Sequence, residues 1–109
     1  MAFATYSNDS LTVIEVESSS FDSKMVTQFR QFIDGLPETG DKPILLDLSH
    51  VSFMDSSALG VLMAFKKHHM TSEISVVTES APVLQLLKVT KVDQIVRVYS
   101  DIEQAILAS

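Results

Sequence analysis

The chain has 109 residues and a mass of 12.0 kDa, a length that predicts a single domain over residues 1–109. Its 8 basic and 14 acidic residues give a net charge of −6, which argues against binding to nucleic acid or to an anionic membrane surface. The lack of cysteine excludes disulfides, zinc–thiolate sites and thiol catalysis, and the longest apolar stretch, residues 58–65, is far too short to span a bilayer.

Hydrophobic patterning divides the chain into alternating strands and helices. Asn8-Asp9-Ser10 separates the first two apolar segments and is typical of a hairpin turn. Residues 35–43 hold two glycines and two prolines and predict a loop. In chain order, the predicted elements are strands at 3–7 and 11–17, a helix at 22–36, a strand at 44–48, a helix at 57–69, a strand at 73–78, a helix at 82–89, a strand at 95–98 and a helix at 101–107.

This alternation predicts an α/β fold in the order β-β-α-β-α-β-α-β-α. The opening hairpin makes the central sheet mixed, while right-handed crossovers make the later strands parallel and place helices on the faces of the sheet. The segment 44–48 is nearly all apolar, as expected of a central strand covered on both faces. We therefore expect four to five strands and about four helices.

Asp55, Ser56 and Ser57 stand where the helix after strand 44–48 begins. The simplest interpretation is that Asp55 or Ser56 caps this helix, because helix starts favour these residue types. The functional interpretation is that one serine is exposed for phosphorylation, which adds roughly −1.5 to −2 charges. The helix dipole favours that charge and the Asp55 carboxylate opposes it, so we expect the modification to change partner binding more than folding.

Residues 46–62 read Leu-Asp-Leu-Ser-His-Val-Ser-Phe-Met-Asp-Ser-Ser-Ala-Leu-Gly-Val-Leu. This stretch resembles the motif of the STAS domain family in its stand-alone form, the bacterial anti-sigma factor antagonists. Residues 87–99 are more weakly similar to the family's segment between its third helix and last strand, and the order and length of the elements also match. The resemblance implies a single-domain STAS-like fold.

The resemblance also implies a cytoplasmic, non-enzymatic regulator of transcription that acts by partner switching and needs no cofactor or metal. In the family, a GHKL-type serine kinase that doubles as the anti-sigma factor phosphorylates the serine after the motif aspartate, and a PP2C-type phosphatase reverses this. Only the unphosphorylated form binds the kinase. Carried onto this chain, Ser56 is the phosphoacceptor and Ser57 the secondary candidate. The partner-binding residues expected are Asp22, Ser23, Met54, Asp55, Ser56, Ser57 and Leu59.

Two positions depart from the family pattern. Ala58 stands where glycine is usual, which stiffens the helix start and is expected to oppose close approach of a kinase. Ser19-Ser20 replaces the Gly-Glu that precedes the position of Phe21. An exposed Phe53 or Met54 beside the serines would help a partner to grip the site.

Two other functions compete with this interpretation. The first is that of a constitutive STAS subunit of a larger complex, such as an ABC lipid transporter, which docks without a phosphate cycle. The second is a serine enzyme, but the chain lacks Gly-x-Ser-x-Gly and a histidine suitably placed to reach Ser56. His68 and His69 are adjacent on a helix and point in different directions, so they do not predict a metal site.

Overall fold

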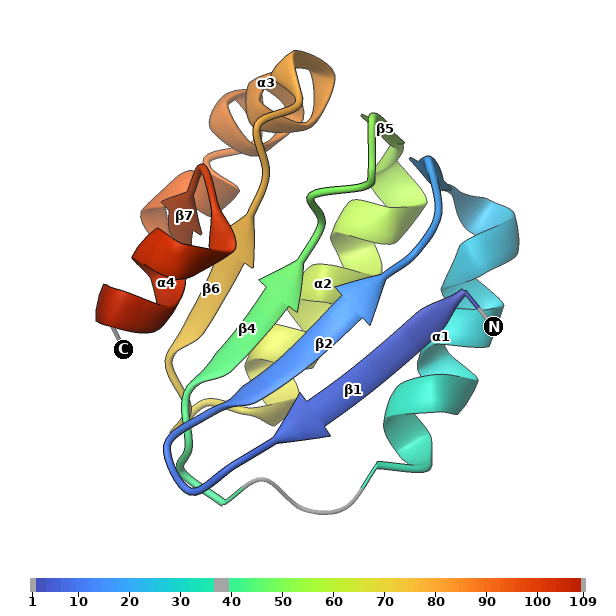
Figure 1. Cartoon of the computed structure of the whole chain (residues 1–109). Helices are drawn as coiled ribbons and strands as arrows, with labels where there is room; N and C mark the ends of the chain where they lie inside the picture. Colours follow the sequence, from blue (N-terminus) through green and yellow to red (C-terminus); the bar gives the residue numbers. More distant parts are fainter. Residues whose placement is uncertain (1, 37–39, 109) are drawn as a thin grey trace.

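The structure is a computed structural model of the chain and describes residues 2–36 and 40–108. A five-stranded sheet in the order β1-β2-β4-β6-β7 forms its centre (Figure 1). β1 runs antiparallel to β2, and the other neighbouring pairs are parallel, which confirms the predicted mixed sheet. Its strands are β1 (Phe3–Ser7), β2 (Thr12–Val16), β4 (Ile44–Asp47), β6 (Ile74–Val77) and β7 (Arg97–Tyr99).

Helices cover both faces of this sheet. α1 and α2 lie together behind it in Figure 1, and α4 lies at the side of β6 and β7. Of the helices in the two described ranges, none has the length and apolar character needed to cross a membrane. The α-helices are α1 (Ser23–Asp34), α2 (Ser56–His68), α3 (Ala81–Val89) and α4 (Ile102–Ala108).

Two hydrophobic cores lie on opposite faces of the sheet, and β4 contributes to both. Ile44 and Leu46 join the larger core with α1, α2 and α3, while Leu45 joins the smaller core with Ala105 of α4. All three β4 side chains are about 1% exposed, which confirms the prediction of a strand covered on both faces. The burial of this apolar strand is a main source of stability, since removal of apolar surface from water dominates folding.

Phe29 of α1 stands at the centre of the larger core. Its ring lies 5.4 Å from the ring of Phe3, 5.3 Å from that of Phe21 and 6.3 Å from that of Phe65, measured between centroids. These separations suit tilted and edge-to-face aromatic contacts. One buried side chain therefore ties α1 to β1, to the segment before α1 and to α2.

The opening hairpin forms as predicted, because Asn8 organises its turn. The side-chain Oδ1 of Asn8 accepts hydrogen bonds from the N–H groups of Ser10 (2.7 Å) and Leu11 (3.0 Å). The Asn8 N–H in turn donates to the carbonyl of Leu11 at 3.0 Å. An asparagine that hydrogen-bonds its own following backbone is the usual way this residue type stabilises a turn.

Two predicted elements differ from the observed ones by two residues at one end, and the others differ by at most one residue at either end. α1 ends at Asp34 rather than at 36, and residues 37–39 of the predicted loop lie outside the described residues. The last strand begins at Arg97 instead of 95, because a 3-10 turn (Val92–Gln94) precedes it. Ile95 closes this turn with φ −112° and ψ −14°, and its N–H donates to the Val92 carbonyl, so Ile95 does not belong to the strand.

Sequence patterning missed a second, two-stranded sheet. β3 (Ser20–Phe21) pairs in parallel with β5 (Phe53–Met54), in the register Ser20↔Phe53 and Phe21↔Met54. A strand of two residues is too short to show alternation of apolar and polar side chains. The pairing therefore depends on how the larger sheet brings the two segments together.

Two carboxylates face one another on neighbouring strands of the main sheet. Glu15 of β2 is in register with Asp47 of β4, whose side chain is only 6% exposed and accepts the Ser49 N–H at 3.0 Å. Burial raises the pKa of Glu15 above its ordinary value of 4.5, and the charges of Asp47 and Glu17 raise it further. Like charges on directly opposite positions destabilise a sheet.

We predict that Glu15→Gln stabilises the protein at neutral pH. The folded protein holds the Glu15 proton more tightly than the unfolded chain does, so wild-type stability falls as pH rises above about 4.5 through the folded pKa. Glutamine does not ionise, so the variant does not lose stability in this way, and its Tm at pH 7 should exceed that of wild type by roughly 2–5 °C. Thermal unfolding at pH 4 and pH 7 measures the difference, which should be small at pH 4.

The matched control is Glu79→Gln, which makes the same change at an exposed glutamate after β6. Its Tm should follow that of wild type at both pH values. A Glu15→Gln protein that is no more stable than wild type at pH 7 contradicts the prediction.

Candidate functional site

The pairing of β3 with β5 brings the N-terminal ends of α1 and α2 side by side. Phe21 and Met54 are in register, so the next residues, Asp22 and Asp55, are neighbours and cap the two helices. The Asp55 N–H continues the pairing by donating to the Phe21 carbonyl at 3.3 Å. Residues more than thirty positions apart in the sequence thereby form one surface at the carboxyl end of the sheet.

Asp55 is the centre of this surface. Its Oδ1 accepts the Ser57 hydroxyl at 2.6 Å and the Ala58 N–H at 3.1 Å. These two bonds, with smaller contributions from the N–H groups of Ser57 and Ser23, lower the pKa of Asp55 below its ordinary value of 3.8. Because Ser23 is the first residue of α1, the carboxylate of one helix cap also interacts with the start of the other helix.

Asp22 caps α1 in the same way. Its Oδ1 accepts the N–H groups of Lys24 at 3.1 Å and Met25 at 3.3 Å. Asp22 is therefore the N-cap of α1, and Ser23 beside it is exposed. Two cap carboxylates therefore lie at one surface.

The structure distinguishes the two serines that follow Asp55. Both are exposed, but the Ser57 hydroxyl donates to Asp55, whereas within the described part of the chain the Ser56 hydroxyl has no hydrogen-bond partner. Ser56 is the first residue of α2 and Ser57 the second. Ser56 therefore presents the freer nucleophilic oxygen.

Three of the predicted features need correction. Met54 and Leu59 are only 5% and 6% exposed and belong to the larger core, so their side chains support the surface from below and do not lie on it. Phe53 is 53% exposed and is the apolar side chain that a partner can touch. Ala58 is fully buried, so its methyl group points into the core and does not oppose the approach of a kinase.

Ser52 fastens the loop that leads into this surface, a role that sequence reasoning missed. Its N–H and its hydroxyl both donate to the Ser19 carbonyl, at 2.8 and 3.1 Å, and its own carbonyl accepts the Ser80 hydroxyl at 3.1 Å. These bonds tie the segment before β5 to the start of β3 and to the residue before α3. No sequence signal marks Ser52, because its partners come from two distant segments.

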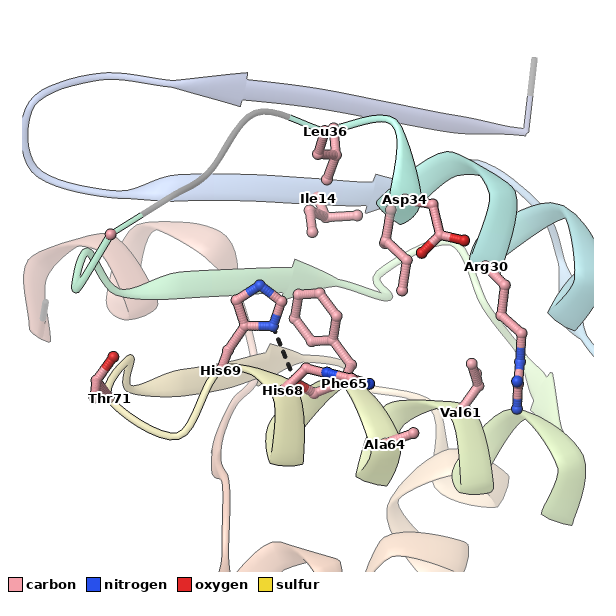
Figure 2. Close-up of a pocket in the computed structure, with 12 residues that line it drawn as sticks. Ile14, Arg30, Asp34, Leu36, Val61, Ala64, Phe65, His68, His69 and Thr71 are labelled. Atoms are coloured by element: carbon pink, nitrogen blue, oxygen red, sulfur yellow. Dashed lines mark hydrogen bonds between the residues drawn. The ribbon is translucent and has the colours of Figure 1, made fainter.

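A cavity of about 560 Å³ lies at the other end of α1 and α2, between their last turns (Figure 2). Arg30 and Asp34 line it from α1, and Phe65 and His69 from α2. The His69 ring stacks on Phe65 with centroids 4.4 Å apart, and its Nδ1 lies 3.1 Å from the Phe65 carbonyl oxygen. The opposite charges of Arg30 and Asp34 offset one another, so we place the candidate site at the N-terminal ends of the helices and not here.

No group of three or more His, Cys, Asp or Glu side chains in residues 2–36 and 40–108 is arranged to hold a metal ion. His68 and His69 lie at the last turn of α2, at the end opposite to Ser56. The surface around Ser56 therefore offers hydroxyl, carboxylate and aromatic groups, which suit docking of another protein.

The comparisons with known proteins agree with this fold. A family model described as "Mlab, STAS domain" matches residues 4–97. A candidate anti-sigma factor antagonist from Thermotoga maritima is 25% identical, with a TM-score of 0.81 over 97% of this chain and 92% of that chain. An anti-sigma factor antagonist from Mycobacterium paratuberculosis is 23% identical, with a TM-score of 0.83 over 97% and 91%. The anti-sigma factor antagonist SpoIIAA in its unphosphorylated form is 20% identical, with a TM-score of 0.75 over 96% and 93%.

We predict that Asp55→Ala lowers the Tm and that Asp55→Asn lowers it less. Alanine removes the acceptor for the Ala58 N–H, whereas asparagine keeps a capping oxygen and loses only the charge. Because the Asp55 pKa is lowered on folding, the advantage of wild type over Asp55→Asn is present at neutral pH and is lost as pH falls below 3.8. Thermal unfolding between pH 7 and pH 3 measures both effects.

Asp9→Ala, at an exposed aspartate of the hairpin turn, is the control and should change the Tm less than Asp55→Ala. Equal stabilities of wild type and Asp55→Ala at pH 7 would show that Asp55 does not cap α2 in solution.

Proposed function

The chain belongs to the STAS domain family, and we propose that it is an anti-sigma factor antagonist whose docking to a partner is switched by phosphorylation of Ser56. The main support for this proposal is the exposed Ser56 hydroxyl, which has no hydrogen-bond partner in the described ranges and lies at the start of α2 beside Asp55. The solved relative SpoIIAA is described as an anti-sigma factor antagonist in its unphosphorylated form, which supports this kind of modification here.

A phosphate on Ser56 would act on a partner more than on the fold. The N–H groups at the start of α2 already interact with the Asp55 carboxylate, so few donors remain to bind a phosphate within the chain. The modification adds roughly −1.5 to −2 charges to a surface that already holds Asp22 and Asp55. Repulsion within the chain is moderated by solvent, whereas a docked partner would exclude solvent and face both the charge and the bulk.

The partner proposed is a serine kinase of the GHKL type that is also the anti-sigma factor, with a PP2C-type phosphatase removing the phosphate. The docking surface would consist of Asp22, Ser23, Phe53, Asp55, Ser56 and Ser57, which are exposed or half-buried around the two helix starts. The role proposed is that of a binding protein, with no catalytic residue, cofactor or metal of its own.

A second candidate is a constitutive STAS subunit that docks on a larger complex, such as an ABC lipid transporter. The matching family model is described as "Mlab, STAS domain", without mention of an anti-sigma factor, and this supports the subunit function as an alternative. The same surface would be used, but without a phosphate cycle. The two functions differ in whether charge at Ser56 controls docking.

We predict that Ser56→Ala retains partner binding, whereas Ser56→Asp weakens it by about tenfold or more, because a carboxylate at the centre of the docking surface meets the partner's interface without a compensating cation. The partner is first isolated by pull-down with unmodified protein, and binding of each purified variant is then measured by calorimetry. Incubation of the complex with ATP should phosphorylate Ser56, as mapped by mass spectrometry.

Ser10→Asp is the matched control, because it introduces the same charge in the β1–β2 turn, at the opposite end of the sheet. It should bind as wild type does. Similar binding by Ser56→Ala and Ser56→Asp would favour the constitutive subunit, and phosphate on another residue would contradict the site.

Gly60 gives a further reason to place the docking surface on α2. It lies four residues after Ser56, hence on the same face of the helix, and it is exposed. Apart from its two chain neighbours and the backbone of its own helix, no described residue has an atom within 4 Å of the place where a Cβ would stand. Internal packing therefore does not require glycine, although glycine in a helix interior costs about 1 kcal/mol relative to alanine.

We predict that Gly60→Ala raises the stability of the free protein by about 0.5–1 kcal/mol and weakens partner binding. Beyond its chain neighbours and the backbone of its own helix, the added methyl group meets no described part of the chain, but it would stand between α2 and a partner that approaches closely. Chemical denaturation and calorimetry measure the two effects. Lys67→Ala, at an exposed position nearly two turns further along α2, should leave binding unchanged. Unchanged binding by Gly60→Ala would remove Gly60 from the docking surface.

A further inference from the structure

The two edges of the main sheet differ in how well they are protected. At one edge, β7 has only three residues, and the exposed Arg97 forms an ion pair with Glu73. At the other edge, β1 has five residues, Phe-Ala-Thr-Tyr-Ser, with neither a charge nor a proline. Short length, charged side chains and proline are the usual means by which proteins prevent edge strands from pairing with other chains. β1 has none of these protections.

The backbone groups that β1 leaves unpaired can be assigned from its register with β2. Asn8 is opposite Leu11 in a hydrogen-bonded pair, and the Glu17 N–H donates to the Ala2 carbonyl. Hydrogen-bonded and non-bonded pairs alternate along an antiparallel ladder. Ala4 and Tyr6 therefore bond to β2, and Phe3, Thr5 and Ser7 direct their N–H and C=O groups away from it.

These outward groups are arranged symmetrically about Thr5. A second β1 strand running antiparallel would place Thr5 opposite its own copy and Phe3 opposite Ser7. Such an arrangement is the self-complementary interface that a two-fold axis requires. Each outward N–H of one strand then meets an outward carbonyl of the other.

β1 itself carries no charged side chain. The charges nearest to it are Glu15, opposite Ala4 on β2, and the Lys42 ammonium, which donates to the Ser7 hydroxyl at 2.8 Å at the end of the strand. Phe32 of α1 packs against Phe3 with ring centroids 5.6 Å apart and is half-buried. One and two turns earlier on the same side of α1 lie Gln28 and Met25, which are also uncharged. The half-exposed Tyr6 ring adds apolar surface on the other face of the sheet.

We propose that β1 is an interface with a second copy of this chain, through antiparallel β1–β1 pairing centred on Thr5. The two sheets become one continuous sheet across the two-fold axis. The interface is separate from the surface around Ser56, which lies at the starts of α1 and α2, so the inference does not depend on the proposed phosphorylation.

To test this proposal, sedimentation equilibrium would measure the oligomeric state of the full chain at protein concentrations between about 10 µM and about 1 mM. Wild type should show a monomer–dimer equilibrium in this range. Thr5→Lys, which places like charges opposite one another at the two-fold axis, should weaken the dimer by about fivefold or more. Thr5→Pro, which removes an outward N–H without breaking the ladder to β2, should weaken it further.

Thr71→Lys makes the same change at an exposed threonine after α2 and should dimerise as wild type does. Circular dichroism of each variant checks that the fold is retained. In wild type, the amide protons of Phe3, Thr5 and Ser7 should exchange more slowly at high than at low protein concentration. A monomer at 1 mM, or a dimer that Thr5→Lys and Thr5→Pro leave unchanged, would overturn the proposal.

Discussion

The parallel contact between β3 and β5 holds the candidate site together. Each strand has only two residues, yet their register sets Asp22 beside Asp55 and aligns the starts of α1 and α2. The Asp55 carboxylate strengthens the arrangement because it interacts with N–H groups of both helices. Ser52 adds bonds to Ser19 and Ser80, so three segments meet at one point. The geometry of the surface therefore follows from long-range backbone contacts.

This arrangement explains how a surface serine can carry a signal while the fold stays unchanged. Asp55 accepts the Ala58 N–H, one of the donors that would otherwise bind an anion at the start of α2. The Ser57 hydroxyl is also engaged, which leaves Ser56 directed to solvent. Charge added at Ser56 would then be felt mainly by a molecule that covers the surface, since desolvation strengthens electrostatic interactions.

The surface around the two helix starts is separate from the open edge of the sheet at β1. Asp22 and Asp55 mark the former, and the backbone groups of Phe3, Thr5 and Ser7 mark the latter. Docking at the first depends on charge, whereas pairing at the second depends on main-chain hydrogen bonds. Two such surfaces can be occupied at the same time because they involve different elements.

The sequence by itself determined the α/β class, the hairpin at Asn8, the buried strand at 44–48 and a helix cap at Asp55 or Ser56, because each depends on local turn chemistry or on the periodicity of apolar residues. It also suggested a partner-facing Met54, and only the tertiary structure showed that this side chain is buried while Phe53 is exposed. Alternation along two residues of β5 cannot assign faces, so the pairing with β3 decides which side chain turns inward. The family resemblance had already ranked Ser56 above Ser57, but only the tertiary structure gave a physical reason, since it depends on which hydroxyl reaches Asp55 across a folded helix start.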